Sequence, residues 1–211
     1  MKTLELFAGS RSFSKVAAQY DFETYTTDNQ DFDSIDQVCD IFDFNIDEAL
    51  MDLDGHPDII WASPPCTTFS VASIGHHWTG GKEAYIPKTK EAVLGMAIVK
   101  KLWEIIKELN PIWYYIENPR GLLRKLPITQ KFEFRNTVWY CKYGDTRAKP
   151  TDIQTNNMKW IPREMCRNNS PTCNHERAPR GSRTGTQGLK GNYERSIVPY
   201  ELCKEILESS Q

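Results

Sequence analysis

Short apolar segments alternate along this sequence with segments of helical spacing, and this alternation most constrains the fold. Six segments have the composition and length of strands: residues 3–7, 22–29, 57–63, 112–118, 137–144 and 151–156. Residues 89–110 carry apolar side chains at helical intervals and end before Pro111, and residues 199–209 form a similar segment that begins at Pro199. Alternating strands and helices favour a doubly wound α/β fold with a mostly parallel sheet.

The length and composition of the chain indicate one globular unit. A chain of 211 residues can bury one α/β core, so we expect a single domain over residues 1–211. Residues 67–87 are predicted to form a polar loop, and residues 157–196 a small irregular insertion within that domain. Met1 leads into the first strand without a secretory leader, and no apolar segment has membrane-spanning length, so we expect a cytoplasmic protein with reduced cysteines.

Charge divides unevenly along the chain. Residues 1–99 carry 6 Lys and Arg against 16 Asp and Glu, whereas residues 100–211 carry 20 against 12. The basic residues cluster in the irregular stretch from Arg163 to Arg195. A polyanionic partner such as a nucleic acid would therefore meet the second half of the chain.

Two predicted strand ends carry reactive side chains. Cys66 directly follows Pro64 and Pro65, two prolines that stiffen the turn after the apolar segment 57–63. Glu117 and Asn118 end another buried strand. In open α/β sheets, ligands bind beyond the carboxyl ends of the strands, so we expect Cys66 and Glu117 to face one crevice. The structural alternatives are a small cysteine that fills a gap and a carboxylate that caps a strand.

In this order, the segments ELFAGSRSFS, TTDN, CDI, SPPCTTFS and IENPRG resemble the motifs of the cytosine-C5 DNA methyltransferases. The resemblance covers residues 3–120 well and continues weakly through YGDTRAKPTD and ERSIVPYELCKEI. It implies a methyltransferase fold in which the first motif cradles S-adenosylmethionine, an aspartate contacts its ribose and a "DI" pair contacts its adenine. The cofactor residues implied are Phe7, Ala8, Gly9, Ser10, Arg11, Ser12, Asp28, Asp40, Ile41, Pro64, Arg195 and Ser196.

The resemblance assigns the chemistry to Cys66 and Glu117. Carbon C5 of cytosine is a poor nucleophile, but addition of a thiolate at C6 makes the ring enamine-like, so that C5 can attack an electrophilic methyl group. A free thiol has a pKa of about 8.5, and a helix start or a nearby cation would favour the thiolate. Glu117 would donate a proton to N3 of a base that is flipped out of the duplex or single-stranded. The predicted catalytic set also contains Asn118, Ser70, which could contact phosphate, and Arg147.

The sequence departs from the family near both ends of the implied cofactor site. Arg11 and Ser12 replace the usual glycines of the first motif, and Arg195 stands where the family has an asparagine. A cation at position 195 could pair with a carboxylated donor, which would give 5-carboxymethylcytosine instead of 5-methylcytosine. It could equally point at DNA phosphate, so both donors stay open.

The usual target-recognition domain of the family is absent, and the insertion 157–196 takes its place. Cys166, Cys173 and His175 lie in this polar segment, and Cys141 precedes it, so the four could hold a tetrahedral zinc ion. The alternative without a metal ion is two reduced loop cysteines and an exposed histidine. Four basic residues follow and are predicted to contact the DNA backbone: Arg177, Arg180, Arg183 and Lys190.

Two further functions remain open from the sequence. A degenerate relative could bind DNA without chemistry, as Arg11 and Arg195 would favour, although an intact Cys66 and Glu117 disfavour it. The same catalytic set would also serve an RNA cytosine methyltransferase. The small size resembles members of the family from phages, which suggests a restriction-modification or phage setting, and the sequence predicts no oligomeric state.

Overall fold

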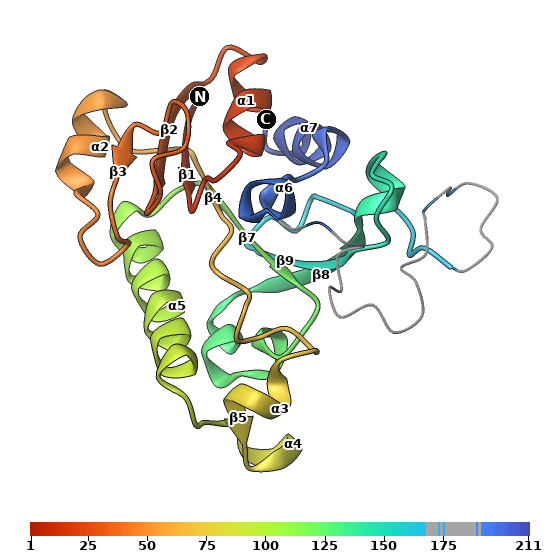
Figure 1. Ribbon diagram of the computed structural model, residues 1–211. Helices are drawn as coiled ribbons and strands as arrows, with labels where there is room; N and C mark the ends of the chain where they lie inside the picture. Colours follow the sequence, from red (N-terminus) through yellow and green to blue (C-terminus); the bar gives the residue numbers. More distant parts are fainter. Residues whose placement is uncertain (168–172, 174, 176–188, 190) are drawn as a thin grey trace.

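Among the described residues, seven strands form the central sheet, and six of them run in the same direction. The computed structural model describes residues 1–167, 173, 175, 189 and 191–211 (Figure 1). Within these residues the sheet has the order β3-β2-β1-β4-β7-β9-β8. The strands are β1 (Lys2–Leu6), β2 (Glu23–Asp28), β3 (Gln37–Val38), β4 (Ile59–Ala62), β7 (Trp113–Pro119), β8 (Phe134–Trp139) and β9 (Pro150–Thr155).

The direction of β9 refines the sequence prediction. Strands β3, β2, β1, β4 and β7 pair in parallel, as expected, but β9 pairs antiparallel with both β7 and β8. Only residues 140–149 join β8 to β9, and parallel neighbours need a crossover of about a dozen residues or more. This short connection, which contains the 3-10 helix η3 (Tyr140–Tyr143), therefore reverses the chain.

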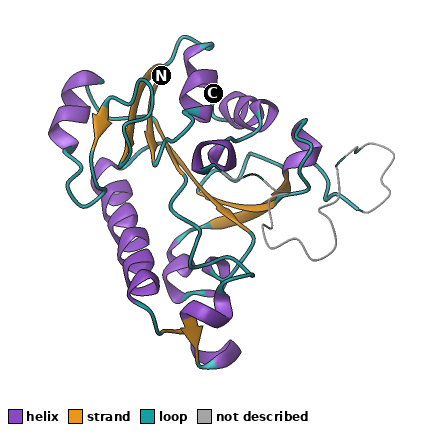
Figure 2. Ribbon diagram, viewed as in Figure 1, coloured by secondary structure: helices purple, strands orange, loops and turns teal. Residues whose placement is uncertain are grey.

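Helices cover both faces of the sheet, and the alternation of side chains along β4 shows why. Ile59 and Trp61 pack with the apolar faces of α1 (Ser12–Ala18) and α7 (Tyr200–Ser209). Ile60 and Ala62 point to the opposite face, toward α5 (Lys90–Leu109) and α2 (Ile46–Asp52). Successive strand residues face opposite sides, so a run that is apolar throughout indicates a sheet buried on both sides. Figure 2 shows the resulting layers.

The long helix α5 has clear start and stop signals. The Thr89 side chain accepts a hydrogen bond from the Ala92 amide at 3.2 Å, which satisfies one of the unpaired donors of the first turn. Asn110 ends the helix in the left-handed conformation, and Pro111 follows. None of the helices in the described part of the chain has both the length and the apolar character needed to cross a membrane.

The segment predicted as a polar loop is more ordered than expected. It contains α3 (Ile74–His77), α4 (Gly81–Ala84) and a two-stranded ribbon of β5 (Trp78–Thr79) and β6 (Ile86–Pro87). Trp78 holds this segment beneath the Cys66 turn, because its indole N–H donates to the carbonyl of Thr68 at 2.7 Å and its ring packs on Phe69. One large aromatic residue thus orders a stretch that its polar composition left unassigned.

Short helical segments lie in the connections after β7 and β9. The 3-10 helices η1 (Leu123–Lys125) and η2 (Pro127–Lys131) lead from β7 to β8, and α6 (Asn192–Ser196) precedes α7. Residues 157–167 contain no helix or strand, in keeping with the irregular insertion predicted there. Helices α1 and α7 lie side by side, so the two ends of the chain meet on one face of the sheet (Figure 1).

Candidate active site

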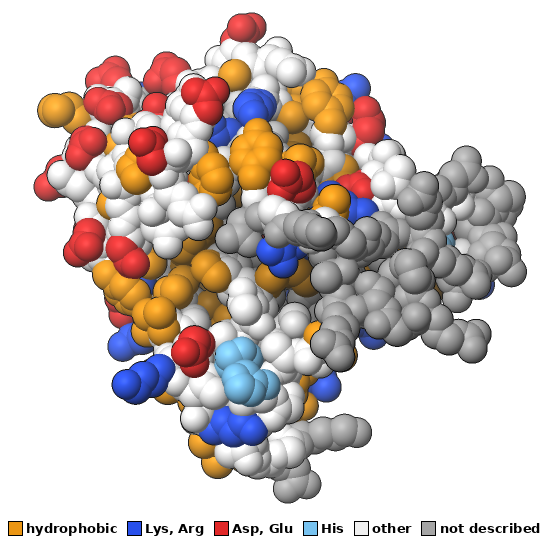
Figure 3. All heavy atoms as spheres, in the orientation of Figure 1, with side chains coloured by type: hydrophobic (Ala, Val, Ile, Leu, Met, Phe, Trp, Pro, Cys, Tyr) orange, Lys and Arg blue, Asp and Glu red, His pale blue; other side chains and the backbone are white. Residues whose placement is uncertain are grey.

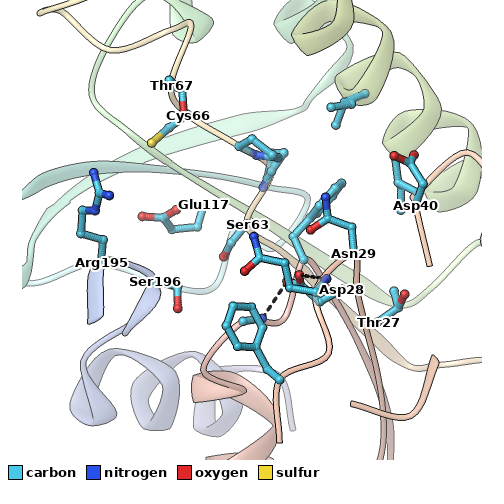
Figure 4. A pocket seen from close by; sticks show the side chains of 18 of the residues that line it. Thr27, Asp28, Asn29, Asp40, Ser63, Cys66, Thr67, Glu117, Arg195 and Ser196 are labelled. Carbon is cyan, nitrogen blue, oxygen red and sulfur yellow. Dashed lines mark hydrogen bonds between the residues drawn. The ribbon is translucent and has the colours of Figure 1, made fainter. Parts of the chain in front are cut away.

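The carboxyl ends of β1, β2, β4 and β7 open into a cavity of about 300 Å³. Cys66, Glu117 and Arg195 lie together at one end, and Asp28 and Asp40 lie toward the other (Figure 4). Parallel strands end at the same edge of a sheet, so residues far apart in sequence converge there. A cavity of this size with a few polar groups is typical of a site for a small organic ligand.

Cys66 sits on a tight turn just beyond β4. The amides of Phe69 and Ser70 donate to its carbonyl at 3.0 and 3.1 Å, and its side chain is half-buried in the cavity wall. The Asn118 side-chain amide donates to the Pro64 carbonyl at 3.2 Å, which ties the end of β7 to the proline pair. Asn118 therefore fixes the turn that carries the thiol but does not itself line the cavity.

Glu117 is 5% exposed and its carboxylate has two donors on a single oxygen. The Tyr140 hydroxyl donates to Oε1 at 2.8 Å, and the Lys149 ammonium group donates to the same atom at 3.2 Å. Burial, followed by the charge of Glu117, raises the pKa of the Tyr140 phenol well above its usual value, so Tyr140 is a neutral donor.

The surroundings of Cys66 shift the pKa of its thiol upward. Burial raises its pKa first, and the charge of Glu117 raises it further, while Lys149 and Arg195 lower it. The expectation that nearby cations favour the thiolate is correct in direction, but the net shift of the Cys66 pKa is upward, because desolvation of the charged form outweighs the cations.

The other end of the cavity is built around Asp28. The Gly9 amide donates to Oδ2 of Asp28 at 2.9 Å, and the Gln30 amide donates to Oδ1 at 3.0 Å. Burial raises the pKa of Asp28, while these amide hydrogen bonds oppose the shift. Phe7 and Ile41 supply apolar surface beside this carboxylate, so the cavity combines a polar acceptor with an apolar wall.

The segment after β1 is joined to the end of α6. Gly9 has a φ of 51°, and a Cβ there would lie 2.8 Å from the Ser196 Oγ. That hydroxyl accepts from the Ser10 amide at 3.2 Å, and the Ser12 hydroxyl accepts from the Val198 amide at 3.0 Å. Glycine is needed at position 9 because a residue with a side chain would be strained in this left-handed conformation and would also crowd Ser196.

Eight of the twelve predicted cofactor residues line the cavity: Phe7, Gly9, Asp28, Asp40, Ile41, Pro64, Arg195 and Ser196. Ala8, Ser10, Arg11 and Ser12 do not. Ala8 and Ser10 are buried, and the Ser10 and Ser12 side chains contact each other at 2.7 Å. Arg11 precedes α1 in the left-handed conformation, and its buried Nε has no hydrogen-bond partner among the described residues. These residues shape the turn behind the cavity wall.

Besides Asn118, two predicted catalytic residues lie away from the cavity wall. The Ser70 hydroxyl bonds to that of Ser73 at 3.0 Å within the turn after Cys66. Arg147 is paired with Asp145, and its guanidinium group also donates to the carbonyl of Ile197 at 3.0 Å. The placement of Arg147 in the catalytic set is not supported by its position, because its charge is used within the protein to hold the segment that leads into α7.

Arg195 lies at the Cys66 end of the cavity. Its Nε donates to the Gly191 carbonyl at 3.0 Å, and the side chain is exposed. Its charge lowers the pKa of the Cys66 thiol, after the larger effects of burial, Glu117 and Lys149. The sequence analysis placed Arg195 near the reacting groups, and the structure puts it beside them (Figure 4).

A cluster of four possible metal ligands lies outside this cavity. The ligand atoms of Cys141, Cys166, Cys173 and His175 all lie within 4.8 Å of one another. The Cys166 and Cys173 sulfurs are 3.5 Å apart, and the His175 Nδ1 lies 3.5 and 3.2 Å from them. Tetrahedral zinc with ordinary bond lengths places sulfurs about 3.8 Å apart and sulfur about 3.6 Å from nitrogen. The donor set and its spacing therefore fit a metal ion.

Comparisons with known proteins identify the family. The sequence profile of the C-5 cytosine-specific DNA methylases matches residues 1–133, which is more than half of the chain. The chain belongs to this family. The prediction of the family, and of an enzyme of the DNA (cytosine-5)-methyltransferase type, is confirmed.

One curated member of the methylase family matches this chain over nearly its whole length. A protein of Frog virus 3 (isolate Goorha), described as "Probable DNA (cytosine-5)-methyltransferase", is 28% identical over 219 residues and covers 99% of both chains. A solved structure from an E. coli prophage, assigned as a DNA modification methyltransferase, has a TM-score of 0.52 at 14% identity. It covers 79% of this chain, and this chain spans about half (52%) of that structure, so the likeness supports the fold alone.

Sequence reasoning missed several residues of the methylase cavity. Lys149 was not in the predicted set, although it shares a weakly matching segment with Arg147, yet it lines the cavity and pairs with Glu117. A cation five residues after Gly144 and directly before β9 was the available signal. Asn29 and Cys39 also line the cavity; they lie within the segments TTDN and CDI but were not singled out. The lining residues Gln30, Phe32 and Ile98 lie outside the motifs.

Proposed function

We propose that this methylase transfers a methyl group from S-adenosylmethionine to C5 of cytosine in DNA. The observation that carries the proposal is that Cys66 and Glu117, from the ends of two adjacent parallel strands, line one cavity with Asp28 and Asp40. A thiol and a carboxyl group that share a pocket can engage two atoms of one pyrimidine ring, and the remainder of the cavity has room for a donor.

Cys66 is the proposed nucleophile. Its thiolate adds to C6 of the base, and Glu117 donates a proton to N3, which neutralises the negative charge that develops on the ring. Carbon C5 then accepts the methyl group. Loss of the C5 proton and expulsion of Cys66 restore the aromatic ring. Lys149, which lies beside both side chains, supports this chemistry by opposing the upward shift of the Cys66 pKa and by fixing the carboxyl group.

The donor end of the cavity fits S-adenosylmethionine, which supplies an electrophilic methyl group on a sulfonium. Asp28 offers carboxylate oxygens at a strand end, where a ribose is commonly bound. Ile41 and Phe7 offer apolar contacts to an adenine ring, and Gly9 lets the backbone approach closely. These residues bind and orient the donor.

A carboxylated donor is the second candidate, and the position of Arg195 favours it. Arg195 lines the Cys66 end of the cavity, where a carboxylate on the transferred group would lie. Mass spectrometry of nucleosides from treated DNA separates the two donors, because 5-carboxymethylcytosine and 5-methylcytosine differ in mass. Product from S-adenosylmethionine alone, with none from the carboxylated analogue, would end this alternative.

We also propose that the ligand cluster holds one structural zinc ion. Cys141, Cys166, Cys173 and His175 would fill all four positions of a tetrahedral site, which leaves none open for catalysis. Zinc content measured by plasma mass spectrometry should be about one per chain, and Cys166→Ser should lower it severalfold. Cys203→Ser, a buried cysteine on α7 outside the cluster, is the matched control. Equal zinc in both variants would refute the site.

The contact with DNA is proposed to involve the insertion 157–196 of a single domain spanning residues 1–211. The predicted phosphate contacts Arg177, Arg180, Arg183 and Lys190 lie outside the described residues. Acidic side chains gather over α2, β2 and β3 (Figure 3), which supports a DNA contact formed by the second half of the chain.

Trapping on DNA that contains 5-fluorocytosine tests the proposed function. Fluorine at C5 blocks loss of that substituent, so a working thiol stays covalently bound in the presence of donor. Cys66→Ser should abolish the adduct, whereas Cys39→Ser, which removes another cavity thiol, should retain it. An adduct that survives Cys66→Ser would overturn the assignment, and no adduct at all would favour a DNA-binding relative without chemistry. Comparing tritium release from DNA and RNA tests the RNA alternative.

A further inference from the structure

The hydrogen bonds to the Glu117 carboxyl group fall on one of its two oxygens. Tyr140 and Lys149 both donate to Oε1, at 2.8 and 3.2 Å. Among the described residues, no hydrogen bond reaches Oε2. Glu117 also lines the cavity beside Cys66, so Oε2 is the oxygen that remains for a bound base.

Tyr140 is held more firmly than a surface donor would be. Its side chain is 0% exposed and packs among Val138, Ile153 and Cys203 between the sheet and α7. Its backbone amide donates to the Lys149 carbonyl at 3.2 Å, and the Lys149 Nζ lies 4.6 Å from the centre of its ring. The two donors to Oε1 are therefore joined to each other and move together.

We infer that Tyr140 is a positioning residue for Glu117: with Lys149 it holds Oε1, so that the proton Glu117 delivers to the base lies on Oε2. This inference rests on the proposed function. An oxygen that already accepts two hydrogen bonds has no room to donate one in the same directions. Without the Tyr140 hydroxyl, the carboxyl group turns more freely about its last torsion, and either oxygen can carry the proton.

Exchange of the C5 hydrogen of cytosine in DNA, measured without donor, reports the step that this inference concerns. The Cys66 thiolate adds at C6, the Oε2 proton passes to N3, and C5 takes a proton from solvent and then loses its tritium to solvent. Return of the N3 proton to Glu117 and departure of the thiolate regenerate cytosine. Release of tritium therefore follows addition and N3 protonation before any methyl transfer.

Tyr140→Phe should slow tritium release about tenfold to hundredfold and leave KM for DNA within about twofold, because the carboxyl group of Glu117 loses one of the two hydrogen bonds that fix it. Tyr143→Phe is the matched control. Tyr143 lies on the same 3-10 helix and is 1% exposed, but its hydroxyl donates to Glu205 on α7 at 3.1 Å. It should release tritium within about twofold of the wild-type rate.

The outcomes separate positioning from a general structural role. Tritium release within twofold of wild type in Tyr140→Phe, or equal slowing in Tyr143→Phe, would overturn the inference. Because Tyr140 acts through Glu117, adding Tyr140→Phe to Glu117→Gln should cost less than about twofold more, and a full further loss would also overturn it. If wild type and Cys66→Ser release tritium equally slowly, the proposed function itself fails, and the inference with it.

Discussion

Removing the cation of the buried Lys149–Glu117 pair gives a quantitative test of how the active site is held. The Lys149 Nζ and Glu117 Oε1 atoms are 3.2 Å apart, and the two side chains are 12% and 7% exposed. At that distance unit charges attract by about 5 kcal/mol at an effective dielectric constant of about 20. Desolvation offsets much of this, and removing one partner of a buried pair costs about 3–5 kcal/mol. Tyr140 still donates to the same oxygen, so we expect Lys149→Met to cost about 3 kcal/mol.

Denaturant unfolding followed by tryptophan fluorescence, with zinc present throughout, measures this free energy. A loss of about 3 kcal/mol corresponds to a fall in Tm of roughly 6–12 °C for a chain of this size. Adding Glu117→Gln removes the unpaired charge and should recover about 1 kcal/mol or more. Lys107→Met, at an exposed position on α5, should stay within about 0.5 kcal/mol of wild type. A strictly additive double variant would refute the reasoning.

Three further outcomes follow from the geometry. Glu117→Gln should speed alkylation of Cys66 by iodoacetamide at pH 8, because the charge of Glu117 is the second-largest cause, next to burial, of the raised pKa of that thiol. Peptide mass spectrometry measures the rate, and slower labelling would contradict the prediction. Gly9→Ala should destabilise the protein by about 1–3 kcal/mol and weaken donor binding in calorimetry, since its Cβ would lie 2.8 Å from the Ser196 Oγ; an unchanged Kd would count against it. Leu202→Ala, at a fully buried position on α7, should cost about 2–5 kcal/mol in thermal unfolding, and a cost below 1 kcal/mol would show that the site collapses.

The parallel part of the sheet could be predicted from sequence because its strands are apolar on both faces. The run from Ile59 to Ala62 is buried at every position, and such a run favours a central strand. The reversed direction of β9 could not be predicted in this way. It depends on the length of the connection from β8 to β9, and the position of that connection became clear only from where β8 ends.

The candidate site was predictable where rigid local chemistry marks it and not where it depends on pairing across the sheet. Pro64 and Pro65 predict the turn that carries Cys66, and the strand order explains why Glu117 lies nearby. Arg147 and Lys149 are two residues apart, yet one pairs with Asp145 and the other with Glu117. The weak resemblance to the family favoured the arginine, and nothing local in the sequence indicates which cation faces the cavity.

The two hydrogen bonds that join Ser10 to Ser196 and Ser12 to Val198 have a consequence for biosynthesis. The glycine turn behind the donor cavity emerges from the ribosome among the first residues, but its partners emerge almost two hundred residues later. A nascent chain stalled before residue 196 therefore contains Cys66 and Glu117 but lacks Ser196 and Val198, which bind this turn in the folded protein. Under the proposed function, the cavity for the donor is complete only after the segment around residues 196–198 has left the ribosome and packed against this turn.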